Sequence, residues 1–170
     1  MKIIEKVKMH MQYYKQEADD WCVYACTQML LTFNGIAHYN QNDLHQIHLE
    51  GNPKKDMSIK IFIDNLNKKI NNRIQYINNV SLPMSKIKDF IDLELPVYAN
   101  IYLEPSGTMG HSLIIYGYDD NQQILKVIDP QPINKLGRGT CYDLSYPEFD
   151  QYYNRYKQAH VGNEIFVVEE

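Results

Sequence analysis

Apolar positions recur at helical spacing near the start of the chain. Between Trp21 and Asn34 they share one face of a helix, which carries Cys22, Cys26, Met29, Leu30 and Phe33. Asp19 or Asp20 can cap the start of this helix, and Gly35 lies where a C-terminal glycine is expected. The pattern therefore predicts a helix over about residues 21–34 with its apolar face toward the core.

Three further helices are expected before residue 94. The first runs from about Gln41 to Leu49, with Asn40 as its N-cap. The second begins near Ser58 and has one apolar side, formed by Ile59, Phe62, Ile63, Leu66 and Ile70. The third covers about residues 85–93. These segments together predict a largely helical first half of the chain.

The second half changes to short runs with strand character. After Pro96 the runs VYANIYL, HSLIIYGY and ILKVID are rich in β-branched and aromatic residues, and Asp119–Asn121 separates the last two as a hairpin-like turn. A short helix over about 146–156 and a final strand, EIFVV, complete the pattern. Helices first and antiparallel strands afterwards predict an α+β fold. We expect a single domain over residues 1–170, with a helical lobe over about 16–93 and a sheet lobe over about 94–170.

Composition and charge narrow the class of protein. The 170 residues are enough to bury the core of one domain, and 44% hydrophobic and 22% charged residues are typical of a globular chain. A net charge of −4 does not indicate a basic surface that would bind nucleic acid. No apolar run approaches the roughly 20 residues that span a bilayer, and the N-terminus lacks the apolar core of a secretory signal. We expect a cytoplasmic protein without nucleic-acid or membrane partners; secretion by another route, processing of the N-terminus and oligomeric state stay open.

Three cysteines, Cys22, Cys26 and Cys141, leave at least one thiol free. Cys22 lies in the first turn of the first predicted helix, where partial positive charge and free N–H groups lower the pKa of a thiol. Cys26 lies one turn later on the apolar face and is expected in the core. Because a single cysteine is more often buried packing than a nucleophile, the case for Cys22 depends on its companions.

Three polar residues could act together with Cys22. Gln16, six positions earlier, could donate its side-chain amide to an oxyanion beside the N–H of Cys22. His111 opens one strand and Asp129 ends the next, so an antiparallel pairing would bring the carboxylate to the imidazole and orient it. Each has an ordinary structural alternative: a polar loop residue, a strand-edge histidine or an Asp-Pro turn. Gly110 would let a substrate approach the histidine closely.

The segments that carry these residues resemble a known family. QEADDWCVYACTQMLLTFNG, followed by NQNDL, is similar to the N-terminal half of papain-like cysteine peptidases. The resemblance is closest to the bacterial C39-like group, which includes the peptidase domains that trim double-glycine leaders from bacteriocin precursors. LPVYANIYL, GHSLIIYGYD and ILKVIDP resemble the histidine and aspartate strands of the same group. The resemblance covers about residues 16–50 and 94–132.

This resemblance implies a papain-like fold and a cysteine peptidase that acts on a peptide or protein substrate through a thioester. The implied catalytic residues are Cys22 as nucleophile, His111 as general base and then acid, Asp129 as the residue that orients His111, and Gln16 as oxyanion donor. Trp21 and Gly110, which adjoin the nucleophile and the base, would contact substrate. No cofactor is expected.

Two departures and two alternatives qualify this interpretation. Leader peptidases usually have glycine after the nucleophile, whereas this chain has Val23, and no phosphate-binding G-x-x-x-x-G-K-[ST] loop of an exporter is present. His38, His45 and His48 have no acidic or cysteine partner at standard zinc spacing, so no metal is expected.

The same thioester could instead serve an acyl transferase or transpeptidase. A non-catalytic peptide-binding module on the same fold is the other alternative.

Overall fold

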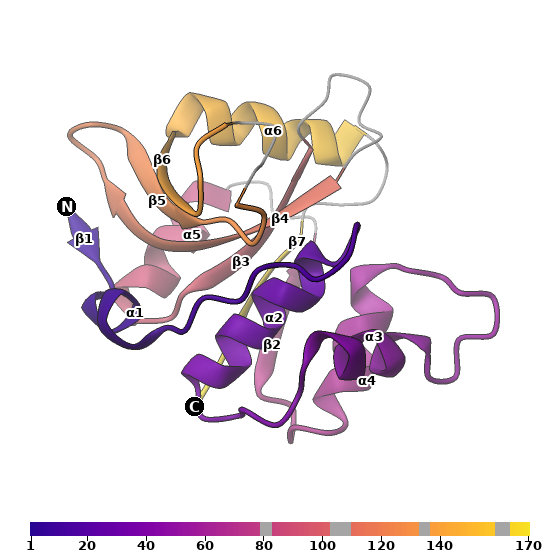
Figure 1. Cartoon of the computed structure of the whole chain (residues 1–170). Helices are drawn as coiled ribbons and strands as arrows, with labels where there is room; N and C mark the ends of the chain where they lie inside the picture. Colours follow the sequence, from indigo (N-terminus) through magenta and orange to yellow (C-terminus); the bar gives the residue numbers. More distant parts are fainter. Residues whose placement is uncertain (79–82, 103–109, 133–136, 159–163) are drawn as a thin grey trace.

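The structure is a computed structural model that describes residues 1–78, 83–102, 110–132, 137–158 and 164–170 (Figure 1). The elements in chain order are β1 (Lys2–Ile3), α1 (Glu5–His10), α2 (Cys22–Phe33), α3 (Gln41–Leu49), α4 (Ile59–Asn67), β2 (Ile74–Asn78), α5 (Pro83–Asp92), β3 (Val97–Tyr102), β4 (Gly110–Asp119), β5 (Ile124–Ile128), β6 (Cys141–Ser145), α6 (Tyr146–Gln158) and β7 (Glu164–Val168). The predicted α+β class is confirmed.

The described strands form one antiparallel sheet in the order β2-β7-β3-β4-β5-β6, and β1 pairs with β4. β3 pairs with β4 as far as Ile115, and β1 pairs with the same strand at Gly117 and Tyr118. Two strands from before residue 94, β1 and β2, therefore belong to the sheet. The sheet is built from both halves of the chain.

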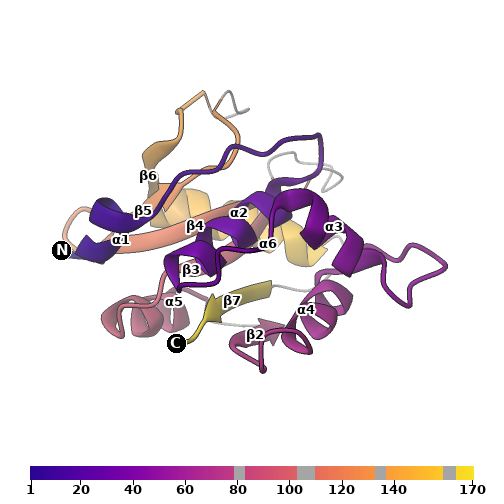
Figure 2. The same cartoon turned by 60° about the horizontal axis from the view of Figure 1, so that its bottom comes forward.

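Helices cover both faces of the central strands. α2 and α6 lie on opposite sides of β3 and β4, as the two views in Figures 1 and 2 show. α3 packs on α2 and α4, and α5 packs against β1, β3 and β4. The predicted apolar face of α2 lies in the core, where Cys26, Met29 and Leu30 are fully buried. Burial of this face fixes α2 against the sheet and so determines where its first residue lies.

The start of α2 differs from the sequence prediction. Trp21 is its N-cap and makes no side-chain cap hydrogen bond, so the expectation that Asp19 or Asp20 caps the helix is wrong. The reason is the backbone of Asp20, whose φ of 65° places it in the left-handed region that aspartate tolerates. This residue belongs to a turn in which the Trp21 N–H donates to the Ala18 carbonyl at 3.2 Å. At the other end, Gly35 has the positive φ of 83° expected of a C-terminal glycine.

The other predicted helices are present, with one correction. Asn40 caps α3 in a capping box, in which its side chain accepts from the Asp43 N–H and the Asp43 carboxylate accepts from the Asn40 N–H. α4 ends at Asn67, so Ile70 does not belong to the helical face on which it was expected, although it is buried. Among the described residues no helix combines the length and apolar character needed to cross a bilayer.

Candidate active site

Cys22 is the first residue of α2 and is partly exposed. Its amide belongs to the first turn, where backbone N–H groups have no acceptor within the helix. These groups and the helix dipole place partial positive charge beside the sulfur. A thiol in this place is exposed enough to react and lies in a field that favours its ionised form.

His111 is the second residue of β4 and is buried, with 6% of its surface exposed. Its Nε2–H donates to Asp129 Oδ1 at 2.8 Å. The imidazole also interacts with Cys22, and this interaction lowers the pKa of the thiol and raises that of the ring. Because Nε2 is used by the carboxylate, Nδ1 is the nitrogen that serves the thiol. The ring therefore connects an acid on one side to a sulfur on the other.

Asp129 follows β5 directly and is fully buried. The expected antiparallel pairing of the two strands is present, with Ile114 opposite Ile128, and it brings the end of β5 beside the start of β4. The Gln131 N–H also donates to Oδ1, at 2.9 Å, and the Tyr142 hydroxyl donates to Oδ2 at 2.7 Å. A buried carboxylate needs such donors to stay charged.

The pKa values of Cys22 and His111 shift in opposite directions. Burial has the largest single effect on Cys22 and raises the pKa of its thiol, but hydrogen bonds from His111 and Ser112 and the charge of His111 outweigh it and lower the pKa. Burial likewise lowers the pKa of His111, but its bonds to Asp129 and Cys22 outweigh burial and raise the pKa to about 9. Together these shifts favour a thiolate–imidazolium pair at neutral pH.

The other two cysteines lack this environment. Cys26 is fully buried, as expected, and its pKa is raised well above the usual value by burial and by the charges of Cys22 and Asp129. Cys141 begins β6 and is exposed. Of the three thiols, Cys22 combines access to solvent with an adjacent imidazole.

Cys22 and His111 open into a cleft of about 520 Å³. One wall comes from the start of α2 and the segment that leads into α4, and includes Asp20, Val23, Met57 and Ile59. The other wall comes from the sheet and includes Tyr76, Asn100, Tyr102, Gly110, Ser112 and Glu164. The first wall also includes Asp56, Ser58 and Lys60, so both walls offer hydrogen-bonding groups, and Val23, Met57 and Ile59 provide apolar contacts.

Gln16 lies beside this group but does not line the cleft. Its backbone N–H donates to the Pro130 carbonyl at 2.8 Å, next to Asp129, and its side-chain amide donates to the Ala18 carbonyl at 3.3 Å. The side chain lines another hollow, of about 320 Å³. Its Oε1 is buried and has no hydrogen-bond partner among the described residues. Gln16 is thus close to the aspartate turn, with its amide directed to the backbone.

The two residues expected to contact substrate are placed differently. Gly110 lines the cleft at the start of β4. A Cβ there would meet the Tyr102 ring at 3.7 Å, which is an ordinary contact. The Trp21 ring packs against Tyr24 and His45, with centroids 5.7 and 5.2 Å away, and is not among the residues that line the cleft.

Two polar residues of the site were not predicted. Ser112 interacts with Cys22 and lowers the pKa of its thiol. The sequence held one signal for Ser112, because it is a polar residue next to a candidate histidine in an otherwise apolar run. Tyr142 contacts Asp129 from β6, a strand that the sequence pattern did not predict, and no local signal pointed to it.

The histidines of α3 serve hydrogen bonds between helices. The Nδ1 atoms of His45 and His48 lie 3.2 and 2.9 Å from the Tyr24 hydroxyl, and His48 Nε2 donates to the Ser58 carbonyl at 2.9 Å. In the part of the chain that the structure describes, no three histidine, cysteine or acidic side chains are grouped closely enough to hold a metal ion.

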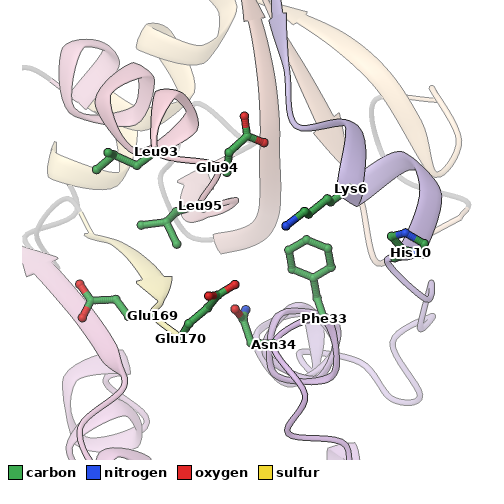
Figure 3. Close-up of a pocket in the computed structure, with 9 residues that line it drawn as sticks. All are labelled: Lys6, His10, Phe33, Asn34, Leu93, Glu94, Leu95, Glu169 and Glu170. Carbon is green, nitrogen blue, oxygen red and sulfur yellow. The ribbon is translucent and has the colours of Figure 1, made fainter.

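A larger hollow, of about 730 Å³, lies at the opposite end of α2. It is lined by residues of α1, the end of α2, the segment after α5 and the C-terminal segment, among them Lys6, Phe33, Glu94 and Glu170 (Figure 3). Its lining residues include no thiol or hydroxyl nucleophile. The smaller cleft at Cys22 is therefore the candidate active site.

The overall fold is that of C39-like peptidases. The structure is similar to the crystal structure of a presumed C39-like peptidase from Bacillus anthracis, with a TM-score of 0.69 over 100% of this chain and 98% of that chain, at 13% sequence identity. Residues 8–161 match the Peptidase_C39 like family, and the chain belongs to that family. Family and fold together support a peptidase, which is a hydrolase. No curated protein matches the sequence.

Proposed function

We propose that this protein is a cysteine peptidase that hydrolyses a peptide bond through a thioester on Cys22. The observation that carries the proposal is that Cys22 and His111 line one cleft, with Asp129 bonded to the imidazole behind it. The imidazole of His111 is bonded through Nε2 to the buried Asp129 and interacts with the thiol at the start of α2. A nucleophile, a base and a group that orients the base are the parts that covalent peptide hydrolysis requires.

In the first half of the proposed reaction, the Cys22 thiolate attacks the carbonyl carbon of the substrate. The carbonyl oxygen becomes an oxyanion, which the backbone N–H of Cys22 can bind. Gln16 would be the second donor, with its amide turned from the Ala18 carbonyl toward the cleft. The His111 imidazolium gives its proton to the leaving amine as the C–N bond breaks, and the acyl group stays on sulfur as a thioester.

The second half of the reaction restores the enzyme. Neutral His111 removes a proton from water, and the resulting hydroxide attacks the thioester carbonyl. The tetrahedral intermediate collapses, the C–S bond breaks, and the acid product leaves. Cys22 is again a thiolate and His111 again an imidazolium. Asp129 orients and stabilises the protonated ring.

The cleft suggests how a substrate would be held. An extended peptide between the two walls would pass close to Gly110 and lie against the apolar side chains of Val23 and Met57. Trp21 would act through the start of α2, since its ring packs against side chains of α2 and α3. The activity that we propose for this arrangement is the trimming of a peptide or leader substrate.

The test compares two cysteines on the same helix. We expect Cys22→Ala to lower turnover of a mixed peptide library by at least about 10³-fold, because no nucleophile remains. Since Cys22 is partly exposed, its thermal unfolding midpoint should stay near that of the unaltered protein. The matched control, Cys26→Ala, removes a buried thiol one turn away; it should lower stability through a small cavity but keep most of the activity of the folded protein. Normal cleavage by Cys22→Ala would overturn the proposal.

A further inference from the structure

The Asp129 carboxylate is bound on both oxygens, and only one of them faces His111. Oδ1 accepts from His111 Nε2 at 2.8 Å and from the Gln131 N–H at 2.9 Å. Oδ2 accepts from the Tyr142 hydroxyl at 2.7 Å. A carboxylate held on one oxygen alone can turn about its Cβ–Cγ bond. A second bond on the other oxygen prevents this rotation.

The strand register explains why Tyr142 reaches the carboxylate. Tyr142 of β6 lies opposite Val127 of β5. Asp129 is two residues beyond Val127, so it is directed to the same face of the sheet as Tyr142. The phenol is half-buried, and the Arg138 guanidinium lies over its ring with the central carbon 5.9 Å from the centroid. The ring is thus held between its own strand and a cation while its hydroxyl points at Asp129.

The phenol can act only as a donor to this carboxylate. Burial and the charge of Asp129 raise the pKa of Tyr142, so the hydroxyl keeps its proton at every pH at which a peptidase would work. Among the described residues, the titratable groups whose pKa Asp129 raises are His111 from β4, Tyr142 from β6, Tyr13 from the N-terminal segment and Cys26 from α2.

We propose that Tyr142 is a positioning residue of the active site. It fixes the Asp129 carboxylate, and through it the His111 ring, in the orientation that supports the thiolate of Cys22. This inference rests on the proposed function, because it assigns Tyr142 to the same catalytic group. The phenol touches neither the thiol nor the cleft, so it acts through Asp129 alone.

Tyr13 provides a matched control. Its hydroxyl donates to the backbone carbonyl of Asp129 at 2.7 Å, the same length as the Tyr142 bond to the carboxylate. Tyr13→Phe and Tyr142→Phe therefore make the same chemical change next to the same residue. Only Tyr142→Phe removes a donor from the carboxylate.

The experiment measures the pH dependence of Cys22 alkylation by iodoacetamide, with the labelled peptide quantified by mass spectrometry. All variants carry Cys141→Ser, which removes the exposed thiol. In Tyr142→Phe the carboxylate is less well oriented and supports the imidazolium less well. The midpoint of thiolate formation should therefore rise by about half to one pH unit, which is less than the roughly one to two units of a direct hydrogen bond to a charged group because the effect reaches the thiol through Asp129 and His111. Alkylation on the acid side of the midpoint should fall several-fold. Tyr13→Phe should leave the midpoint in place.

A double variant tests the route of this effect. If Tyr142 acts through the carboxylate, Tyr142→Phe should shift the midpoint far less in an Asp129→Asn background than alone. An unchanged midpoint in Tyr142→Phe, an equal shift in Tyr13→Phe, or a full shift in the Asp129→Asn background would each overturn the positioning role. Failure of the proposed function itself looks different: Cys22 would then show an ordinary thiol profile in the Cys141→Ser protein before Tyr142 is altered.

Discussion

Burial alone would make Cys22 a weaker acid and His111 a weaker base, and the site reverses both effects. The reversal occurs because the charge of each group stabilises the opposite charge of the other. Asp129, which is bonded to the imidazole, adds to this effect. A buried ion pair is stable only when further hydrogen bonds satisfy its members. Ser112 lowers the pKa of the thiol, and Asp129 accepts a hydrogen bond from the imidazole.

This coupling predicts the pH dependence of the reaction. Activity should fall on the acid side as the thiolate is protonated. It should also fall as the pH rises through about 9, where His111 loses the proton that the leaving amine needs. In Asp129→Ala the alkaline limb should move down toward the ordinary imidazole value of about 6.5, because the ring loses its partner. The measurement is kcat/KM from pH 5 to 10.

Cys141 is an internal reference for this prediction. It is exposed, so its alkylation rate at pH 6 reports an accessible thiol in the same protein. Cys22 should react with iodoacetamide several-fold faster at that pH. A Cys22 that reacts no faster than Cys141 would contradict the ion pair and favour a non-catalytic binding module.

The sequence predicted the neighbourhood of the site better than its detail. Order and spacing along the chain were enough to propose Cys22, His111 and Asp129, because a helix start and a two-strand hairpin are local features. Tyr142 is different: its contact with Asp129 depends on the pairing of β5 with β6, which are not adjacent in the sequence. Local pattern cannot encode such a partner.

At the scale of elements, capping explains which boundaries could be predicted. The start of α3 is encoded in four consecutive residues, since Asn40 and Asp43 cap each other. The start of α2 has no such code, because Trp21 makes no side-chain cap and a turn at Asp20 with positive φ precedes it. α2 is placed by burial of its apolar face against the sheet. The short strands β1, β2 and β6 are set by partners distant in sequence and were not predicted.

The α3 cap gives a prediction about stability. Asn40→Ala should lower the free energy of unfolding by about 1 kcal/mol, since it removes the acceptor for the Asp43 N–H. The comparison is Asn42→Ala, an exposed position inside the same helix, which should be neutral or slightly stabilising. Urea unfolding of both variants provides the measurement. An equal loss in the two variants would show that the cap has no special role.

At the scale of the whole molecule, the segment before α2 joins the helices to the sheet. Its backbone binds the Asp129–Pro130 turn through Gln16, and the Tyr13 hydroxyl binds the same turn. The link to the helices is Gln41 of α3, a fully buried side chain that accepts from the Glu17 N–H.

The Gln41 amide completes this link on its other side. Its Nε2 donates to the Lys15 carbonyl at 2.8 Å and to Gln28 Oε1 on α2 at 3.1 Å. One side chain thus connects α2, α3 and the segment that carries Gln16. Of the residues proposed for catalysis, Cys22 lies at the start of a helix, whereas His111 and Asp129 lie at the ends of strands. The segment that carries Gln16 contacts both the helices and the sheet close to these residues.

Gln41→Ala should therefore affect both stability and the site. It leaves the Lys15 carbonyl and the Glu17 N–H without their partner, which should lower the free energy of unfolding by about 1–3 kcal/mol. The segment should also open locally before global unfolding, which limited trypsin cleavage after Lys15 would report. Gln46→Ala, an exposed change on the same helix, should do neither. If Gln41→Ala unfolds earlier in urea but shows no faster cleavage at Lys15, the amide stabilises the helices without holding the segment, and Gln16 must be placed by its bond to Pro130 alone.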